Sequence, residues 1–417
     1  MYGTLDAAEP WSLHYSQTLV SAGFRQGEAS PCHFYHADLD TWILVHGDDF
    51  VIVGRHSGRE HAIATLRNAY EIKVDFAGPA PEDPKELKVL GRVLSFHEWG
   101  ISLEADPSLI ETAVAKMGME EAKGAKSPGA CDDTKLTAAT IKQRRLEADP
   151  SQILVDQEPE ENEEELEPAA KSRYQSVAAL INYVAQDRPD IQYASKECMR
   201  FMSSPRACDE IKLKRIIRYL KTVPRLVSRY QWAPLSSELL VYVDANWAGC
   251  VKTRRSTVGG SIQWQGQFLK SWSRTMEIIA LSSGESELAA VIRGTAEALG
   301  VQSLLKDFGR SVTIQLKSDA TAAIGMVKRL GLGRVRHLSV ADLWIQQRLR
   351  QGGLALSKWP GTLNPSDMMT KHLGRADIKR FAEDLSFTVL AGRPTISPVR
   401  AGKWKSSDVI GVPESPA

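Results

Sequence analysis

Four acidic residues in the C-terminal half of the chain lie at the ends of predicted strands or in the first turns of predicted helices: Asp244, Glu287, Asp319 and Asp367. Asp244 directly follows the apolar run Leu239–Val243, which is typical of a strand covered on both faces. A carboxylate beside a buried strand costs free energy unless it is paired or binds a cation. Four converging carboxylates need cations to compensate their charge, and Mg²⁺ accepts such oxygen ligands. Two such ions about 3.5–4 Å apart can activate a water and stabilise the leaving oxygen of a phosphodiester.

Three of these acids, taken singly, also have structural explanations. Glu287 lies in the first turn of a predicted long helix, where a carboxylate interacts favourably with the helix dipole. Asp319 precedes the helical pattern at 320–328 and fits an N-cap. Asp367 would lie in the first turn of a final helix that begins with Asn364-Pro365 as N-cap and first residue. Only the joint pattern favours catalysis.

Glu285 is a fifth acid that we set aside. Ser282 and Glu285 fit a capping box, in which the Glu285 carboxylate folds back on the backbone N–H of the cap residue. Glu287 is then the free carboxylate of this helix, beside Leu288 on the border of the buried stripe.

The elements that must position the acids alternate as β-β-β-α-β-α-α-β-α. The predicted strands cover 239–243, 256–264, 268–272, 312–316 and 354–359. The first three can pair as an antiparallel meander, with Gly259-Gly260 and Gly266 as breakers or turns. Asp244 and Asp319 would end neighbouring strands, where open α/β sheets bind their ligands. This order predicts that one acid from each of four elements converges on one point.

The N-terminal part of the chain contains a hairpin pattern. The apolar runs 42–45 and 50–53 flank Gly47-Asp48-Asp49, and a Gly/Asp pair between β-rich runs favours a tight turn. Residues 56–124 mix helical spacing with strand-like pieces, which indicates a small α/β or α+β domain. From residue 130 to about 168 acidic residues crowd together, so we expect a disordered insertion, with an acidic interaction segment as the alternative.

The predicted helix around Ile216 is basic. Lys212, Arg215 and Arg218 repeat every three residues and would line one face. The pattern fits either a solvated amphipathic face or a surface that contacts nucleic-acid phosphates.

The overall composition is that of a globular protein with two or three domains. The chain has 417 residues, of which 43% are hydrophobic and 25% charged, and its net charge of +1 gives no global argument for a nucleic-acid partner. No apolar run approaches the ~20 residues that cross a bilayer, and Met1–Pro10 lacks the features of a signal peptide. Five cysteines without metal-ligand spacing indicate free thiols in a reducing compartment. They are Cys32, Cys131, Cys198, Cys208 and Cys250. We expect a soluble, intracellular protein without a membrane partner.

Five motifs surround the acids and their neighbours. They are Val243-Asp-Ala-Asn-Trp-Ala-Gly249, Arg255-Ser-Thr-Val-Gly259, Leu281-Ser-Ser-Gly-Glu-Ser-Glu287, Ser318-Asp-Ala-Thr-Ala-Ala323 and Asp367-Met-Met-Thr-Lys371. In order and spacing they resemble the ribonuclease H domain of copia-type retrotransposon Pol polyproteins. The resemblance implies a mixed five-stranded sheet with flanking helices, a catalytic quartet of Asp244, Glu287, Asp319 and Asp367, and two Mg²⁺ or Mn²⁺ ions held by the same residues. It also leads us to expect nucleic-acid contacts from Arg255 and from His337, which matches the basic-His segment of the family.

The resemblance extends upstream. Tyr174–Tyr219 is similar to the segment that joins reverse transcriptase to ribonuclease H in the same elements, and His46-Gly-Asp-Asp49 is similar to the Tyr-x-Asp-Asp hairpin of the polymerase. The departures are that His46 replaces the Tyr, that the region of the third catalytic aspartate would lie before Met1, and that Met1–Glu9 lacks the family's polar Gln and two basic residues. We therefore expect Asp48 and Asp49 to be relics of a polymerase that no longer copies a template.

We predict an α/β and α+β protein in five segments. They are a partial reverse-transcriptase palm and thumb-like region at 1–129, the acidic insertion at 130–170, a helical connection at 171–235, the ribonuclease H domain at 236–374, and a loosely ordered tail at 375–417. The expected reaction is metal-dependent hydrolysis of the RNA strand of an RNA–DNA hybrid, whose phosphates Lys212, Arg215 and Arg218 would contact. The expected location is a cytoplasmic particle or the nucleus, with other retrotransposon proteins as further partners.

Three alternatives stay open at this point. The chain is a fragment of a longer polyprotein that has polymerase activity, a non-catalytic protein that binds hybrids or other nucleic acid, or the product of a decayed element without a cellular role. An Asp-bearing palm strand upstream would favour the first. Hybrid binding without metal-dependent cleavage would favour the second.

Overall fold

A computed structural model describes residues 8–129, 164–250, 252–333, 335, 337 and 340–397. Most of the predicted acidic insertion, residues 130–163, and the last residues of the predicted tail, 398–417, lie outside this description. No helix within the described ranges is both long and apolar enough to cross a membrane.

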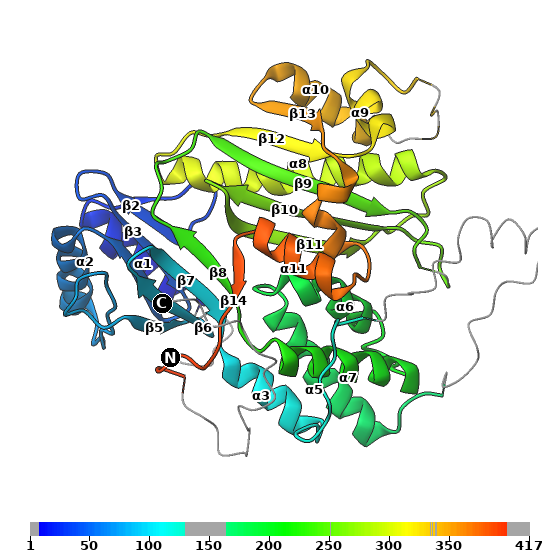
Figure 1. Cartoon of the computed structure of the whole chain (residues 1–417). Coiled ribbons are helices and arrows are strands. Elements are labelled where there is room, and N and C mark those ends of the chain that lie inside the picture. The colour runs from blue at the N-terminus through cyan, green and yellow to red at the C-terminus, as the bar shows by residue number, and fades with distance from the viewer. Residues whose placement is uncertain are drawn as a thin grey trace, which may run out of the picture.

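A mixed five-stranded sheet carries the C-terminal half (Figure 1). Its order is β11 (Gln267–Thr275), β10 (Thr257–Trp264), β9 (Glu238–Asn246), β12 (Thr313–Ser318) and β13 (Leu354–Lys358). The first three strands pair antiparallel, whereas β12 is parallel to both β9 and β13. This arrangement confirms the fold class that the motifs imply and places β9, which carries the first acid, in the centre.

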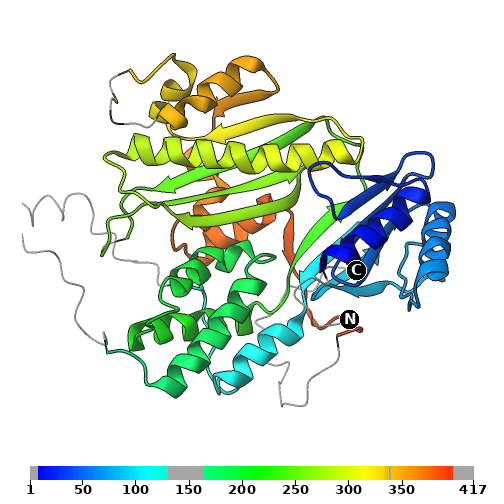
Figure 2. The ribbon, with the colours of Figure 1, turned by 180° about the vertical axis from the view of Figure 1, so that it is seen from behind.

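Helices cover both faces of this sheet. The long helix α8 (Ser283–Asp307) runs across one face, as Figure 2 shows, and buries its apolar stripe on β9, β10 and β12. The other face is covered by the short 3-10 helix η4 (Pro365–Met369) and by α11 (Arg375–Asp384) (Figure 1). Three shorter helices, α9 (Thr321–Lys328), η2 (Val340–Leu343) and α10 (Trp344–Gln351), connect β12 to β13.

The prediction that Gly259-Gly260 breaks a strand is wrong. Both glycines lie inside β10, because their missing side chains leave room for close neighbours. A Cβ on Gly260 would lie 2.1 Å from a ring carbon of Trp272, and a Cβ on Gly259 would lie 2.8 Å from the Cβ of Met369. Gly266 does form the turn between β10 and β11, with a φ of 74°. The two strand glycines therefore let η4 and a tryptophan approach the sheet.

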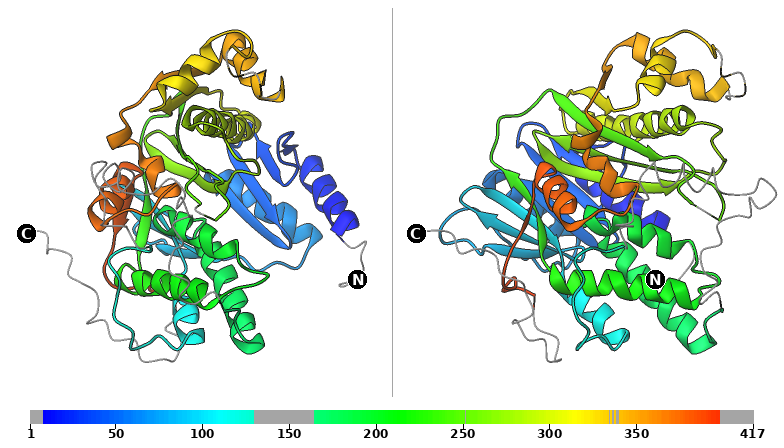
Figure 3. Two further views of the ribbon diagram at one scale, coloured as in Figure 1. Left: turned by 90° about the vertical axis from the view of Figure 1, so that its right-hand side faces the viewer. Right: turned by 45° about the vertical axis from the view of Figure 1, so that its right-hand side comes forward.

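A second sheet joins segments from three parts of the chain. Its order is β14 (Phe387–Val389), β8 (Leu226–Gln231), β7 (Gly100–Ala105), β6 (Arg92–His97) and β5 (Glu86–Val89). The two views of Figure 3 show it between the N-terminal unit and the connection helices. The predicted helical connection at 171–235 therefore ends in a strand, because β8 pairs with β7 from the N-terminal region.

The predicted loosely ordered tail at 375–417 needs a second correction. Residues 375–389 form α11 and β14, in which Phe381 and Phe387 are buried. Phe387 makes an edge contact with Phe268 of β11, with ring centroids 4.9 Å apart. Farther on, the Ser397 hydroxyl donates to Asp106 at 2.6 Å. These apolar and polar contacts order the segment up to residue 397, although its composition resembles that of a flexible tail.

The connection is a helical unit with its own core. It consists of α5 (Pro168–Val184), α6 (Pro189–Met199) and α7 (Ala207–Thr222), against which α3 (Pro107–Lys116) packs from the N-terminal region. Its helices begin at Pro168, three residues before the predicted boundary. A fully buried ion pair between Arg188 and Asp190, with Tyr219 donating to the same carboxylate at 2.8 Å, fixes the start of α6.

The N-terminal unit contains the predicted hairpin. Its elements are α1 (Ala8–Ser21), β1 (Arg25–Gln26), β2 (His33–His36), β3 (Thr41–His46), β4 (Asp49–Gly54) and α2 (His56–Ala69), with a small apolar core. Strands β3 and β4 pair through His46 and Asp49 around Gly47, whose φ is 64°. Asp48 and Asp49 are exposed on this turn.

The N-terminal unit docks on the C-terminal end of α8. There the Asp307 carboxylate accepts backbone N–H groups from Glu28, Ala29 and Ser30 at 3.1, 2.9 and 3.3 Å. A carboxylate at the C-terminal end of a helix is unfavourable on its own, so these three donors compensate it.

Candidate metal-binding active site

Asp244 forms the floor of the candidate site. It lies in β9, is only 4% exposed, and accepts a hydrogen bond from the hydroxyl of Thr370, the residue directly after η4. Just before it, the carbonyl of Val243 accepts a 2.8 Å hydrogen bond from the Asn364 side chain. The segment that carries the fourth acid is thereby tied to the strand that carries the first.

Glu287 extends from the first turns of α8 toward Asp244. Carboxylate oxygens of Asp244, Glu287 and Asp319 all lie within 4.8 Å of one another. The backbone amide of Ala245 hydrogen-bonds to Glu287, but its Oε2 is buried without a hydrogen-bond partner among the described residues. Burial, together with the negative charges of Asp244 and Asp319, raises the pKa of Glu287 to about 9.

Asp319 and Asp367 complete the cluster of acids. Asp319 follows the end of β12, and a Cβ on Gly361 would lie 2.6 Å from its Oδ2, so the backbone passes closely over this carboxylate. Burial and the charge of Asp244 raise the pKa of Asp319. The same two causes raise the pKa of Asp367 to about 7, although the neighbouring ammonium of Lys371 opposes the shift.

The position of Asp367 corrects one sequence prediction. Asn364 does act as the N-cap, accepting a hydrogen bond from the backbone of Ser366 at 3.2 Å, with Pro365 at the first position. The element that follows is a 3-10 helix of 5 residues rather than an α-helix, and α11 begins only at Arg375. The short turn lets the chain reverse so that Asp367 and Thr370 both approach β9.

This donor set fits a divalent cation. Three buried or half-buried carboxylates with one unpaired oxygen are the hard ligands that Mg²⁺ and Mn²⁺ take in proteins. Without a cation, the crowding of like charges keeps protons on some of these groups, as the raised pKa values of Glu287 and Asp367 indicate. Asp367 is outside the group of three and borders it through its electrostatic interaction with Asp244.

Glu285 is the helix cap that the sequence predicts, with one difference. The Ser282 hydroxyl accepts from the Glu285 amide at 3.2 Å, whereas the Glu285 carboxylate accepts from the backbone of Leu281, one residue before the cap, at 2.8 Å. His337 contacts the same Glu285 oxygen through Nε2 at 3.0 Å. His337 therefore borders the site through the cap, and its contact with nucleic acid stays a prediction.

The basic residues of α7 make contacts inside the chain. Arg215 donates to the Ser127 carbonyl and hydroxyl, and Arg218 donates to the Lys123 carbonyl at 2.6 Å. Lys212 is half exposed and lies 3.6 Å from Asp209. Arg215 and Arg218 thus hold the 123–127 segment on α7. Contact of this basic face with phosphates stays a prediction.

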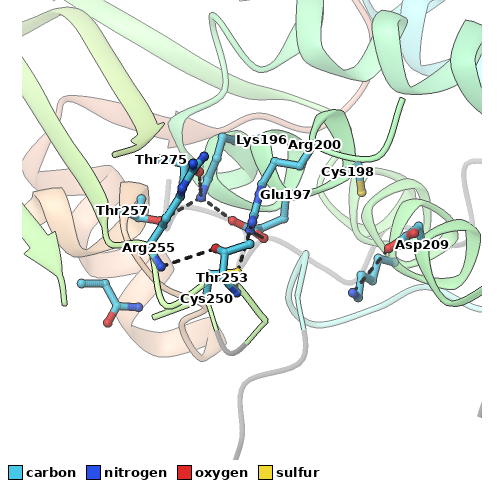
Figure 4. Close-up of polar contacts among 12 residues, drawn as sticks. Lys196, Glu197, Cys198, Arg200, Asp209, Cys250, Thr253, Arg255, Thr257 and Thr275 are labelled. Carbon is cyan, nitrogen blue, oxygen red and sulfur yellow. Dashed lines mark hydrogen bonds and ion pairs between the residues drawn. The ribbon is translucent and has the colours of Figure 1, made fainter. Parts of the chain in front are cut away.

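Arg255 lies in the loop between β9 and β10, beside the connection (Figure 4). Its backbone amide donates to the Thr253 hydroxyl at 3.4 Å, and its side chain is exposed. Next to it, Lys196 of α6 donates to the Thr257 hydroxyl at 2.9 Å, and Arg200 donates to Cys250 Sγ at 3.1 Å (Figure 4). These contacts attach the connection to the loop between β9 and β10. Cys32, Cys198, Cys208 and Cys250 are free thiols, as predicted, and Cys131 lies outside the described residues.

Two residues near the acids were missed in the sequence. Thr370 hydrogen-bonds to Asp244, and Lys371 Nζ lies 2.8 Å from Asp367 Oδ1. Both belong to the motif that begins at Asp367. Their spacing of three and four residues from that acid, which puts side chains on one face of a helical turn, is the pattern that could have identified them.

The chain is similar in sequence to transposon polyproteins. No family model matches the chain. It is 25% identical over 387 residues, 90% of its length, to the retrovirus-related Pol polyprotein from transposon TNT 1-94 of Nicotiana tabacum. It is 28% identical over 221 residues to the corresponding polyprotein from transposon RE1 of Arabidopsis thaliana, which covers 52% of the chain. The chain spans only 27% and 15% of the lengths of these two relatives. Over 124 residues, 30% of this chain, it is 33% identical to secreted RxLR effector protein 161 of Plasmopara viticola, of which it covers 87%.

Solved structures of a ribonuclease H and of a reverse transcriptase match parts of the chain. A ribonuclease H, LC11-RNase H1, matches 32% of this chain and 94% of its own, at 15% identity and a TM-score of 0.26. The foamy viral protease-reverse transcriptase in complex with RNA/DNA hybrid matches 76% of this chain and 36% of its own, at 12% identity and a TM-score of 0.42.

Proposed function

The chain belongs to the family of retrovirus-related Pol polyproteins of copia-type transposons, and on that premise we propose that it is a reverse transcriptase–ribonuclease H fragment that hydrolyses the RNA strand of RNA–DNA hybrids. The observation that carries the proposal is the convergence of Asp244, Glu287 and Asp319 within 4.8 Å, at the ends of β9 and β12 and the start of α8. Asp367 borders this group from η4.

In this proposal the four acids are the metal ligands. Asp244, Glu287 and Asp319 would hold one Mg²⁺ or Mn²⁺, and Asp367 with Asp244 would hold a second. When bound, such ions supply an activated water and charge stabilisation for the leaving oxygen of a phosphodiester. The chain's own contribution is to orient the ligands: the Thr370 hydroxyl fixes one Asp244 oxygen, and the amide of Ala245 fixes Glu287.

The proposed substrate contacts come from basic side chains around the sheet. We propose that Arg255 on the exposed loop edge and Lys212 on α7 contact phosphates, whose attraction for Lys and Arg is independent of sequence. Arg215, Arg218 and His337 remain candidates for the same role. Discrimination of the RNA strand would rest on its 2′-hydroxyl groups.

We assign the nuclease reaction to this chain rather than the polymerase reaction. Asp48 and Asp49 lie on an exposed turn, and within the described ranges the group formed by Asp244, Glu287 and Asp319 is the one set of three potential ligands that could hold a metal. The exposure of Asp48 and Asp49, which are not part of that group, agrees with the proposal that they are relics of a polymerase site.

Cleavage of a labelled RNA–DNA hybrid by the purified chain tests the proposal. We expect Mg²⁺-dependent cutting of the RNA strand, and a loss of at least about 100-fold in Asp244→Asn, because even partners of metal ligands typically contribute 10–100-fold. Asp377→Asn, which changes a half-exposed aspartate paired with Arg380 on α11, is the matched control and should cleave like wild type. If the chain binds the hybrid but shows no metal-dependent cleavage, the enzyme proposal is refuted and the chain is a non-catalytic nucleic-acid-binding protein.

A further inference from the structure

Lys371 places a permanent cation among the four acids. Its Nζ lies 2.8 Å from Asp367 Oδ1, four residues earlier in the chain. The ammonium also interacts electrostatically with Asp244, Glu287 and Asp319. One side chain thus acts on the whole cluster, and it is the side chain that pairs directly with Asp367.

The backbone that carries Lys371 is held on both sides. Its amide donates to the Asp367 carbonyl at 3.2 Å, and the preceding Thr370 hydrogen-bonds to Asp244. The following His372 packs edge-on against Tyr193 of α6, with ring centroids 4.8 Å apart. The start of the Lys371 side chain is therefore fixed, while the side chain itself is 43% exposed and flexible enough to move its ammonium.

The four acids consequently fall into two groups. Asp244, Glu287 and Asp319 bring their oxygens within 4.8 Å of one another, and Glu287 Oε2 has no hydrogen-bond partner among the described residues. Asp367 instead has a cation of the chain itself at ion-pair distance. A divalent ion that enters the first group meets free carboxylate oxygens, whereas an ion that approaches Asp367 meets an ammonium already there.

We propose that Lys371 occupies the position of the second metal ion, so that one ion binds tightly at Asp244, Glu287 and Asp319 while the second must displace the ammonium from Asp367. The inference rests on the proposed metal centre and adds the order in which its ions bind. Displacement moves the ammonium toward solvent on the exposed side of the site. The occupancy of the second position then depends on the concentration of the divalent ion.

Manganese binding to the full chain tests this inference without a cleavage assay. Free Mn²⁺ is counted by electron paramagnetic resonance as it is added to wild type, Lys371→Met, Lys371→Arg and Lys379→Met. Lys379→Met is the matched control, since Lys379 also pairs with an acid four residues away, at 3.8 Å from Glu383, but on the outer surface of α11. Thermal unfolding of each variant shows that it is folded.

For wild type, Lys371→Arg and Lys379→Met we expect one tight and one weak Mn²⁺. In Lys371→Met the weak ion should bind at least about tenfold more tightly, because a positive charge a few ångströms away no longer repels it. The tight ion should change less.

Three results would count against the account, and they are distinguishable. Equal affinity of the second ion in wild type and Lys371→Met, with both folded, would overturn the role of Lys371 and leave the metal centre standing. Absence of Mn²⁺ binding in all four proteins would overturn the proposed metal centre itself. Arginine in place of Lys371 keeps the charge, so tightening in Lys371→Arg as well would assign the effect to side-chain shape and refute the competition.

Discussion

Replacing Glu287 by glutamine should stabilise the metal-free protein at neutral and alkaline pH. The carboxylate of Glu287 is half-buried and faces Asp244 and Asp319, which is why its pKa rises from 4.5 to about 9. An acid whose pKa is higher in the folded state costs stability when it ionises. That cost is absent below pH 4.5, grows as the pH rises from 4.5 to 9, and is complete above pH 9.

The size of this effect follows from the shift. A rise in pKa from 4.5 to about 9 corresponds to at most about 6 kcal/mol of differential stability. Residual structure in the unfolded chain and relaxation around the charge reduce it, so a few kcal/mol is the expected gain for Glu287→Gln near pH 9.

Urea unfolding in the presence of EDTA, measured from pH 5 to pH 9, provides the assay. Wild type should lose stability across this window, and Glu287→Gln should lose much less and be the more stable protein at the alkaline end. Glu277→Gln, on the exposed loop before α8, is the control and should follow wild type. Parallel pH profiles for wild type and Glu287→Gln would refute the electrostatic reasoning.

Three further predictions concern metal binding, the hydrogen bond from Thr370 to Asp244, and the packing of the sheet. Mg²⁺ or Mn²⁺ should raise the unfolding temperature in proportion to the logarithm of its concentration above the dissociation constant, and Asp244→Asn should abolish most of this rise in a thermal scan. Thr370→Val removes the hydrogen bond to Asp244 and should lower metal affinity or hybrid cleavage by about 10–100-fold, while Thr370→Ser should retain both; equal loss in the two would contradict the role of the hydroxyl. Gly260→Ala would bring a Cβ within 2.1 Å of Trp272 and should cost about 1–3 kcal/mol of unfolding free energy, whereas Gly266→Asn at the turn should cost much less.

The ribonuclease H-like sheet was predictable because its strands carry strong local patterns. The run Leu239–Val243 is apolar throughout, as a central strand must be, and the order of strands and helices leaves few ways to pair them. The acids could be placed on their elements for the same reason. Their convergence follows from topology, since β9 and β12 are parallel neighbours and end at the same edge.

The remaining features depend on contacts between distant segments, which local patterns do not encode. β14 is only 3 residues long. It forms because it pairs with β8 and because Phe387 packs against Phe268. Glycine is typical of turns, but Gly260 lies in a strand, because the ring of Trp272 occupies the place where a side chain would be. Lys371 and Thr370 acquire their roles only once η4 has folded over β9. Arg215 and Arg218 have the spacing of a phosphate-binding face, yet their partners are carbonyls about 90 residues away.

Cleavage of the RNA strand in an RNA–DNA hybrid is the most direct test of the central claim. The same strand, end-labelled, is presented in a hybrid, in an RNA duplex and alone to the purified chain with Mg²⁺ or with EDTA. The account predicts cutting of the hybrid in Mg²⁺ that disappears in EDTA and in each of Asp244→Asn, Glu287→Gln, Asp319→Asn and Asp367→Asn. Hybrid cleavage that persists in these variants, or that does not require the divalent ion, would contradict it.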